Sequence, residues 1–140
     1  MNSVYANSIR LRQGPFLSKV KIRNFAFSQG DLTIPGKRGL PPSVPQGSSL
    51  TFVNQDNPLT IRFHTITACK APCNKTTGIA YPLANGPVRF DSGNLGFGPP
   101  GLTAAANRDT WKTPRNLRPG TYTYFCRVHP FMRGGFRVKR

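Results

Sequence analysis

Short runs of alternating apolar and polar residues recur along the chain, separated by turns rich in glycine and proline. In residues 18–28, Val20, Ile22, Phe25 and Phe27 alternate mostly with basic or polar neighbours, which predicts a half-buried strand. Comparable runs predict strands at residues 32–34, 49–54, 61–67, 110–113, 121–126 and 135–139. No run keeps a helical period beyond one or two turns. The pattern predicts an all-β fold, a sandwich or barrel of short strands.

Residues 68–106 interrupt this pattern with many glycines and prolines. We expect them to form a long irregular loop insertion that covers one side of the sandwich, with residues 96–101 irregular throughout. The length of 140 residues suits one domain. We therefore expect residues 1–17 to be a lead-in segment and residues 18–140 to form that domain.

The charge balance is extreme, with 20 Lys and Arg against 4 Asp and Glu, a formal net charge of +16. A field of this sign attracts anionic partners, although it also serves solubility or an acidic or saline habitat. No tract interleaves basic and aromatic residues as a stacking platform for nucleic acid would. We expect an acidic redox protein or an anionic cell-envelope surface as partner, and no specific nucleic acid.

Candidate chemistry gathers in the segment Cys-Arg-Val-His-Pro-Phe-Met, which directly follows the predicted strand at 121–126. Two residues separate Cys126 from His129 and two more separate His129 from Met132, a spacing that lets a tight loop return all three side chains to one point. One thiolate, two imidazoles and a distant thioether are the ligands of a type 1 copper site. The second imidazole falls to His64, since the chain has only two histidines.

Such a site leaves no open position for a substrate, because the protein supplies every ligand. We therefore expect a single-electron carrier that cycles between Cu(I) and Cu(II), and no enzyme. Zinc accepts the same residues in a tetrahedral site, so it is the metal artefact to expect in a recombinant preparation.

At this segment the chain resembles the small blue copper proteins, or cupredoxins, and its loop is most similar to those of amicyanin and plastocyanin. Amicyanin shares the Cys-x-x-His-x-x-Met spacing and the continuation His-Pro-Phe-Met-Arg-Gly. The stretches Pro119-Gly120-Thr121-Tyr122 and Phe90-Asp91-Ser92-Gly93 are also similar to the family. The resemblance spans residues 18–140 and implies a Greek-key β-sandwich, one copper ion and electron transfer between larger redox proteins.

Two residues beside the ligands depart from the family pattern. Val128 replaces a proline and keeps its N–H, a second donor toward the Cys126 sulfur that would raise the reduction potential. Thr65 follows His64 where amicyanin has asparagine, so we expect a different side-chain link between the two ligand loops.

Two further cysteines, Cys69 and Cys73, lie outside the ligand loop. We expect a disulfide that closes the loop after the His64 segment, in an oxidising compartment. A second metal site or a redox switch is the functional alternative. A dinuclear copper centre is disfavoured, because both cysteines would then belong to the ligand loop.

His129 should be the more exposed imidazole, since it lies in a turn, with Pro130 and Phe131 forming an apolar electron-transfer patch around it. We expect a monomer that makes weak, transient contacts there. Copper chemistry and the disulfide predict a periplasmic, cell-surface or secreted protein, although residues 1–7 have no apolar signal core. The leader is then absent from this chain, or the chain is one domain of a longer exported protein.

Two other functions compete with the electron carrier. One is an exported copper-binding domain for storage or delivery, or a module of a larger oxidase. The other is a basic polyanion-binding module whose metal is incidental.

Overall fold

The computed structural model describes residues 14–56, 63–69, 88–97 and 107–140. Within them the chain forms short strands and a single 3₁₀ turn, η1 (Lys37–Gly39). The strands are β1 (Lys19–Arg23), β2 (Ala26–Phe27), β3 (Ser43–Pro45), β4 (Thr51–Asn54), β5 (Thr67–Cys69), β6 (Val88–Asp91), β7 (Gly96–Phe97), β8 (Asn107–Arg108), β9 (Thr110–Lys112), β10 (Gly120–Phe125) and β11 (Arg133–Lys139).

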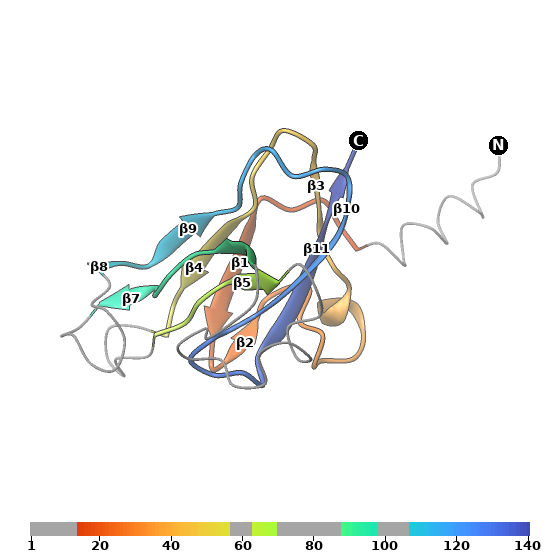
Figure 1. Cartoon of the computed structure of the whole chain (residues 1–140). Helices are drawn as coiled ribbons and strands as arrows, with labels where there is room; N and C mark the ends of the chain where they lie inside the picture. The colour runs from red at the N-terminus through yellow and green to blue at the C-terminus, as the bar shows by residue number, and fades with distance from the viewer. Residues whose placement is uncertain (1–13, 57–62, 70–87, 98–106) are drawn as a thin grey trace.

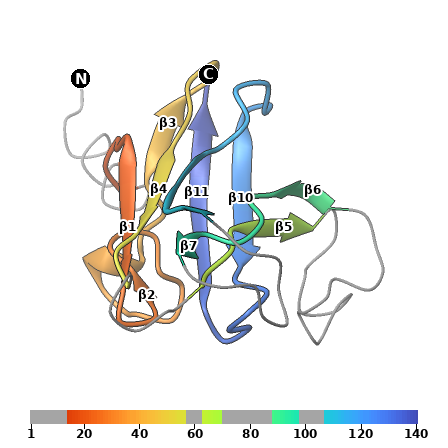
Figure 2. The ribbon, with the colours of Figure 1, turned by 90° about the vertical axis from the view of Figure 1, so that its left-hand side faces the viewer.

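Two sheets make up the sandwich (Figures 1 and 2). One has the strand order β2-β1-β4-β9 and the other β3-β11-β10-β5-β6, while β7 and β8 form a separate pair. Strand β1 runs parallel to β4 and β3 runs parallel to β11, whereas β10 and β11 form a long antiparallel pair. The predicted all-β sandwich is confirmed.

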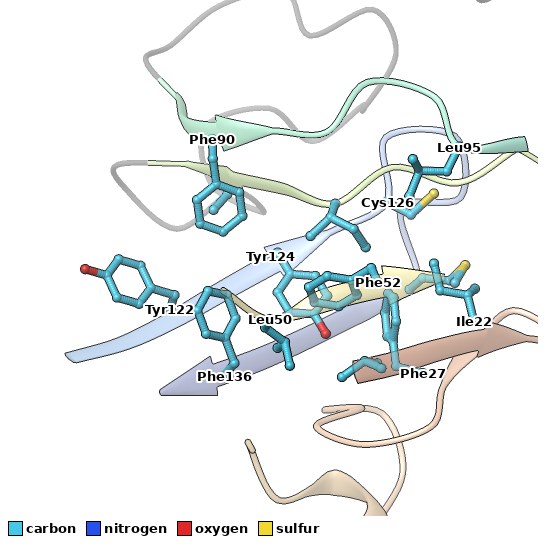
Figure 3. Packing of buried hydrophobic residues seen from close by; sticks show 14 of the residues in the cluster. Ile22, Phe27, Leu50, Phe52, Phe90, Leu95, Tyr122, Tyr124, Cys126 and Phe136 are labelled. Atoms are coloured by element: carbon cyan, nitrogen blue, oxygen red, sulfur yellow. The ribbon is translucent and has the colours of Figure 1, made fainter. Parts of the chain in front are cut away.

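The core lies between the two sheets and is rich in aromatic rings (Figure 3). Val20 and Ile22 point inward from β1 because its exposed and buried positions alternate strictly. The Tyr124 ring packs edge-on against Phe27 and Phe52, with centroids 5.1 and 5.2 Å away. Such aromatic contacts between the sheets hold β2 and β4 at a fixed position over β10.

Glycine permits the close approach of β10 to β11. Tyr124 pairs with Gly134 across the ladder, and its ring occupies the space that a side chain on residue 134 would need. A Cβ atom there would overlap the Tyr124 hydroxyl and ring. Gly134 is therefore required by packing, and not by its backbone angles.

Some strand predictions were wrong. Residues 18–28 form a hairpin, because the chain turns at Asn24 and Phe25, both with positive φ (54° and 60°). Residues 32–34 form a turn, closed by a hydrogen bond from the Ile34 N–H to the Asp31 carbonyl. In the segment 61–67, His64 makes only an isolated bridge to Leu95, and β5 begins at Thr67.

The predicted irregular insertion contains ordered pieces. Strand β6 pairs with β5, and residues 96–97, expected to be irregular, form β7 against β8. Long-range partners create these strands despite the glycine-rich local sequence. The rest of the predicted insertion, residues 70–87 and 98–106, lies outside the described residues, as do residues 1–13 of the predicted lead-in segment. In the described residues no helix has the length and apolar character needed to cross a membrane.

Candidate metal centre

Three of the four predicted ligand side chains converge at one end of the sandwich. The Nδ1 atoms of His64 and His129 each lie 3.8 Å from Sγ of Cys126. All three donor atoms lie within 4.8 Å of one another. His64 comes from the segment bridged to Leu95, whereas the other two lie on the loop between β10 and β11. Residues more than 60 positions apart thus share one small volume.

The separations suit a metal ion between these atoms. Metal–sulfur and metal–nitrogen bonds of about 2.3 and 2.05 Å, enclosing an angle of about 120°, place sulfur and nitrogen about 3.8 Å apart. Both histidines present Nδ1, which leaves each Nε2 free of the metal. Two imidazoles and a thiolate in a plane are the equatorial donors of type 1 copper sites. The residues present therefore fit copper.

Met132 is tied to the other loop residues through its backbone. Its carbonyl accepts the Cys126 N–H at 3.2 Å, and its own N–H donates to the His129 carbonyl at 2.9 Å. These two bonds close the ligand loop on itself. The Met132 side chain is only 2% exposed and belongs to the core cluster, as does Cys126. The ligand loop thereby contributes a buried thioether to the core.

The Cys126 sulfur is buried and receives hydrogen bonds. The backbone N–H groups of Thr65 and His129 each donate to Sγ at 3.4 Å. Burial raises the pKa of the Cys126 thiol, and these hydrogen bonds, with a further contribution from the Val128 N–H, oppose that effect only in part. The same donors stabilise negative charge on sulfur once the thiol proton has left.

Thr65 joins the two ligand segments. Besides its N–H on the sulfur, its hydroxyl accepts the Arg127 N–H at 2.8 Å and contacts the Thr67 hydroxyl at 2.9 Å. The Arg127 guanidinium in turn pairs with Asp91 at 2.5 Å. The Thr65 side chain thus links the segment of His64 to the loop of Cys126, at the position where amicyanin has asparagine.

A buried carboxylate holds the outer side of His64. Asp56 Oδ2 lies 2.8 Å from His64 Nε2, and both side chains are at most 3% exposed. Asp56 also accepts the backbone N–H groups of Asn24 at 2.6 Å and Phe25 at 3.2 Å. Burial acts to raise the pKa of Asp56, but these hydrogen bonds and His64 outweigh it, so the net pKa is lowered. An ionised Asp56 keeps the proton of His64 on Nε2 and Nδ1 free to bind metal.

Phe25 covers both imidazoles from the β1–β2 turn. Its ring lies edge-on to His64 and His129, with centroids 5.9 and 4.9 Å away, and tilted against Phe131 at 6.0 Å. A bulky residue at φ of 60° is uncommon and strained. The two N–H bonds to Asp56 offset that strain, so one carboxylate positions both His64 and the ring that shields it.

One ligand ring approaches the surface while the other does not. His64 is fully buried, whereas His129 is partly exposed. Next to it Phe131 is 62% exposed and Pro130 is partly exposed. Apolar side chains therefore surround the accessible edge of His129. We call this surface, formed by Phe25, His129, Pro130 and Phe131, the His129 patch.

Not every residue singled out from the sequence can be placed. Cys73 lies outside the described residues, so the Cys69–Cys73 disulfide stays a prediction. Among the described residues Cys126 is a free, buried thiol. Sequence reasoning missed Asp56 and Phe25. The rarity of acidic residues was the available signal for Asp56, because a chain with so few carboxylates does not bury one without a specific use.

Among known proteins, only solved structures resemble this chain, and they support its fold. No family model matches the chain, and no curated protein matches its sequence. Auracyanin from Roseiflexus castenholzii is 16% identical with a TM-score of 0.52, over 91% of this chain and 98% of its own. Auracyanin A, a blue copper protein from Chloroflexus aurantiacus, is 17% identical with a TM-score of 0.53, over 90% of this chain and 100% of its own.

A copper-containing nitrite reductase from Thermus scotoductus SA-01 also matches, at 20% identity and a TM-score of 0.53. The match covers 90% of this chain, which spans only 22% of the reductase. The likeness thus covers less than a quarter of the reductase chain. Two β-sheets in this arrangement, with a His-Cys-His cluster at one end and a buried methionine on the same loop, show that the chain has the cupredoxin fold.

Proposed function

We propose that the chain is a one-electron carrier with a single type 1 copper ion held by His64, Cys126, His129 and Met132. The convergence of two Nδ1 atoms and one Sγ in a buried pocket supports this most directly. Bound copper supplies the one-electron Cu(II)/Cu(I) couple, for which imidazole and soft sulfur donors are suitable ligands.

The residues around the ligands hold one geometry. Thr65 and His129 direct N–H groups at the sulfur, and Asp56 fixes the orientation of His64. Phe25 excludes water from the imidazole faces. A site that does not rearrange between oxidation states needs little reorganisation, which favours rapid electron transfer.

The His129 patch is where electrons would enter and leave. Of the two imidazoles only His129 reaches the surface, and apolar side chains around it exclude water on contact with a partner. A small patch of this kind suits weak and transient contacts, as a shuttle between redox proteins requires.

An anionic partner follows from where the acidic residues lie. All four side-chain carboxylates lie in the described residues. Asp31 and Asp56 are buried and accept backbone N–H groups, and the half-buried Asp91 accepts the Gly93 N–H and pairs with Arg127. Asp109 is also half-buried and accepts a hydrogen bond from the Thr110 hydroxyl. Because four side-chain carboxylates cannot pair with 20 Lys and Arg residues, most of the cations lack a carboxylate partner. We propose an acidic redox protein or an anionic envelope surface as partner, outside the cytoplasm.

A module of a larger copper oxidoreductase is the second candidate. It is favoured by the match to one domain of the nitrite reductase, in which the cupredoxin fold forms part of a copper enzyme. With two histidines, this chain alone does not supply the ligands of additional copper centres.

Voltammetry of the copper-loaded protein distinguishes an electron carrier from a copper storage or delivery protein. The carrier predicts a reversible one-electron wave and retention of copper against a weak chelator in both oxidation states. An irreversible wave, together with rapid loss of copper to the same chelator, would favour storage or delivery.

A further inference from the structure

A small hollow on the outer side of the β1–β2 hairpin is lined almost entirely by cationic and hydrogen-bonding side chains. Its volume is about 240 Å³, and its lining residues are Lys21, Arg23, Ser28, Arg38 and Gln55. This is below the range of about 300–1,000 Å³ typical of pockets for organic ligands. The size suits a small anion or a single charged headgroup.

The three cations of the hollow come from two elements, β1 and η1. Lys21 and Arg23 lie two residues apart on β1, so they point outward on the same side of the sheet, and both are exposed. Arg38 reaches the hollow from η1, where its Nε donates to the Phe27 carbonyl at 3.1 Å. That bond fixes the plane of the guanidinium and leaves its terminal nitrogens available for an oxyanion. No carboxylate lines the hollow.

Hydrogen bonds to the backbone set the remaining donors in place. The Ser28 hydroxyl accepts the Lys21 N–H at 2.9 Å, and the Ser28 N–H donates to the Lys21 carbonyl at 2.8 Å. Among the described residues no group accepts the hydroxyl proton of Ser28, which can therefore be donated to a ligand. The Gln29 side chain ties down the η1 loop through the carbonyls of Lys37 and Leu40, at 2.8 and 2.7 Å.

We propose that this hollow binds a tetrahedral phosphate-type dianion, either as inorganic phosphate or as the terminal group of a phosphate monoester. Two guanidinium groups, an ammonium and a hydroxyl supply enough donors for several oxygens at once, and the anion relieves the mutual repulsion of the three cations. The inference is independent of copper, because none of the proposed ligands lines the hollow.

Calorimetric titration of the full chain with inorganic phosphate tests the site, at an ionic strength of about 0.01 M where screening is weak. We expect saturable 1:1 binding that is at least tenfold tighter than binding of acetate. Titration with glycerol 3-phosphate separates the two sources, since tighter binding of the ester indicates an organic phosphate and equal binding indicates the free ion. Equal affinity for acetate and phosphate would overturn the proposal.

A pair of charge-matched variants separates a local site from the general field of the protein. Lys21→Gln with Arg23→Gln should weaken phosphate binding at least tenfold, and so should Arg38→Gln. The control Lys19→Gln with Lys112→Gln removes the same charge from exposed positions of the same sheet that do not line the hollow, and should change binding less than twofold. Equal weakening by both double variants would show a diffuse counterion cloud and contradict the site.

Discussion

Asp56 Oδ2 and His64 Nε2 lie 2.8 Å apart, and this pair connects the proposed metal ligands to the β1–β2 turn. Through the same carboxylate, the Asn24 and Phe25 N–H groups are held beneath the ring that covers the site. The position of a ligand and the shielding of both imidazoles thus depend on one buried negative charge.

Replacing Asp56 by Asn tests that dependence. The amide removes the charge and cannot accept hydrogen bonds at both of its side-chain positions, so the orientation of His64 is lost. We expect copper affinity to fall about 10–100-fold, as for other residues that orient metal ligands. The free energy of unfolding of the metal-free protein should fall by about 1–3 kcal/mol. Competition with a chelator and denaturant unfolding measure the two effects.

Asp109→Asn is the matched control, because it removes the same charge from a partly exposed carboxylate that, within the described part of the chain, accepts a hydrogen bond from the Thr110 hydroxyl and contacts no proposed ligand. Its copper affinity should equal that of the wild type. If both variants lose affinity to the same extent, the effect is one of net charge and the positioning role of Asp56 is wrong.

Phe25 is expected to control solvent access to the ligands. Phe25→Ala opens the faces of both imidazoles, so transfer of Cu(I) to a chelator should become several-fold faster. Phe16→Ala, at an exposed ring outside the site, should leave that rate unchanged. Phe25→Gly should be more stable than Phe25→Ala by about 1–2 kcal/mol, since glycine adopts φ of 60° without strain. Equal stability of the two would contradict the strain.

A part of the site could be predicted from the sequence when its residues lie close together along the chain, and could not when they lie far apart. Cys126, His129 and Met132 lie on one short loop, so their spacing alone indicates a shared metal. His64 could be assigned only because the chain has a single other histidine. The roles of Asp56 and Phe25 become visible only once the β1–β2 hairpin is known. The alternation of apolar and polar residues over 18–28 concealed that turn, because it resembles one uninterrupted strand.

The strands, too, could be predicted where the local sequence pattern is clear and not where distant partners decide. Strands β4, β9 and β10 have clear alternation and were predicted within one or two residues. Strands β6 and β7 were missed, because their pairing partners supply the order that a sequence rich in glycine and proline does not indicate.

Tyr124 predicts how stability responds to alkaline pH. Burial raises its pKa well above 10.0, and its hydroxyl has no hydrogen-bond partner among the described residues. The unfolded chain therefore releases this proton at a lower pH than the folded chain. The protonated Tyr124 hydroxyl therefore leaves the free energy of unfolding unaffected by pH below about pH 10. Above that pH the free energy of unfolding falls by at most about 1.4 kcal/mol per pH unit.

The comparison with Tyr124→Phe isolates this effect from other titrating groups. At neutral pH the variant should be at least as stable as the wild type, because it removes an unpaired buried hydroxyl. Above about pH 10 the wild type should lose stability faster than the variant. Denaturant unfolding at several pH values measures the difference, and parallel curves would contradict the raised pKa.

Two adjacent glycines of β11 differ in the space they have. At Gly134 a Cβ atom overlaps the Tyr124 ring and hydroxyl, whereas at Gly135 the nearest atom is the Tyr122 carbonyl oxygen at 3.4 Å. Gly134→Ala should lower the free energy of unfolding by about 1–3 kcal/mol, as overpacked cores do. Gly135→Ala should cost clearly less. Equal losses would show that β-strand backbone effects, and not the Tyr124 contact, decide the outcome.

Cys126 and the two histidines are proposed to bind a single copper ion as a type 1 site. The most direct measurement is the visible absorption spectrum after one equivalent of Cu(II) is added to the metal-free protein, for wild type and Cys126→Ser. A type 1 site should give an intense copper–thiolate band, and hence a blue colour, in the wild type, and the serine variant should lack it. A colourless wild type with all its copper bound, or the same spectrum from both proteins, would contradict it.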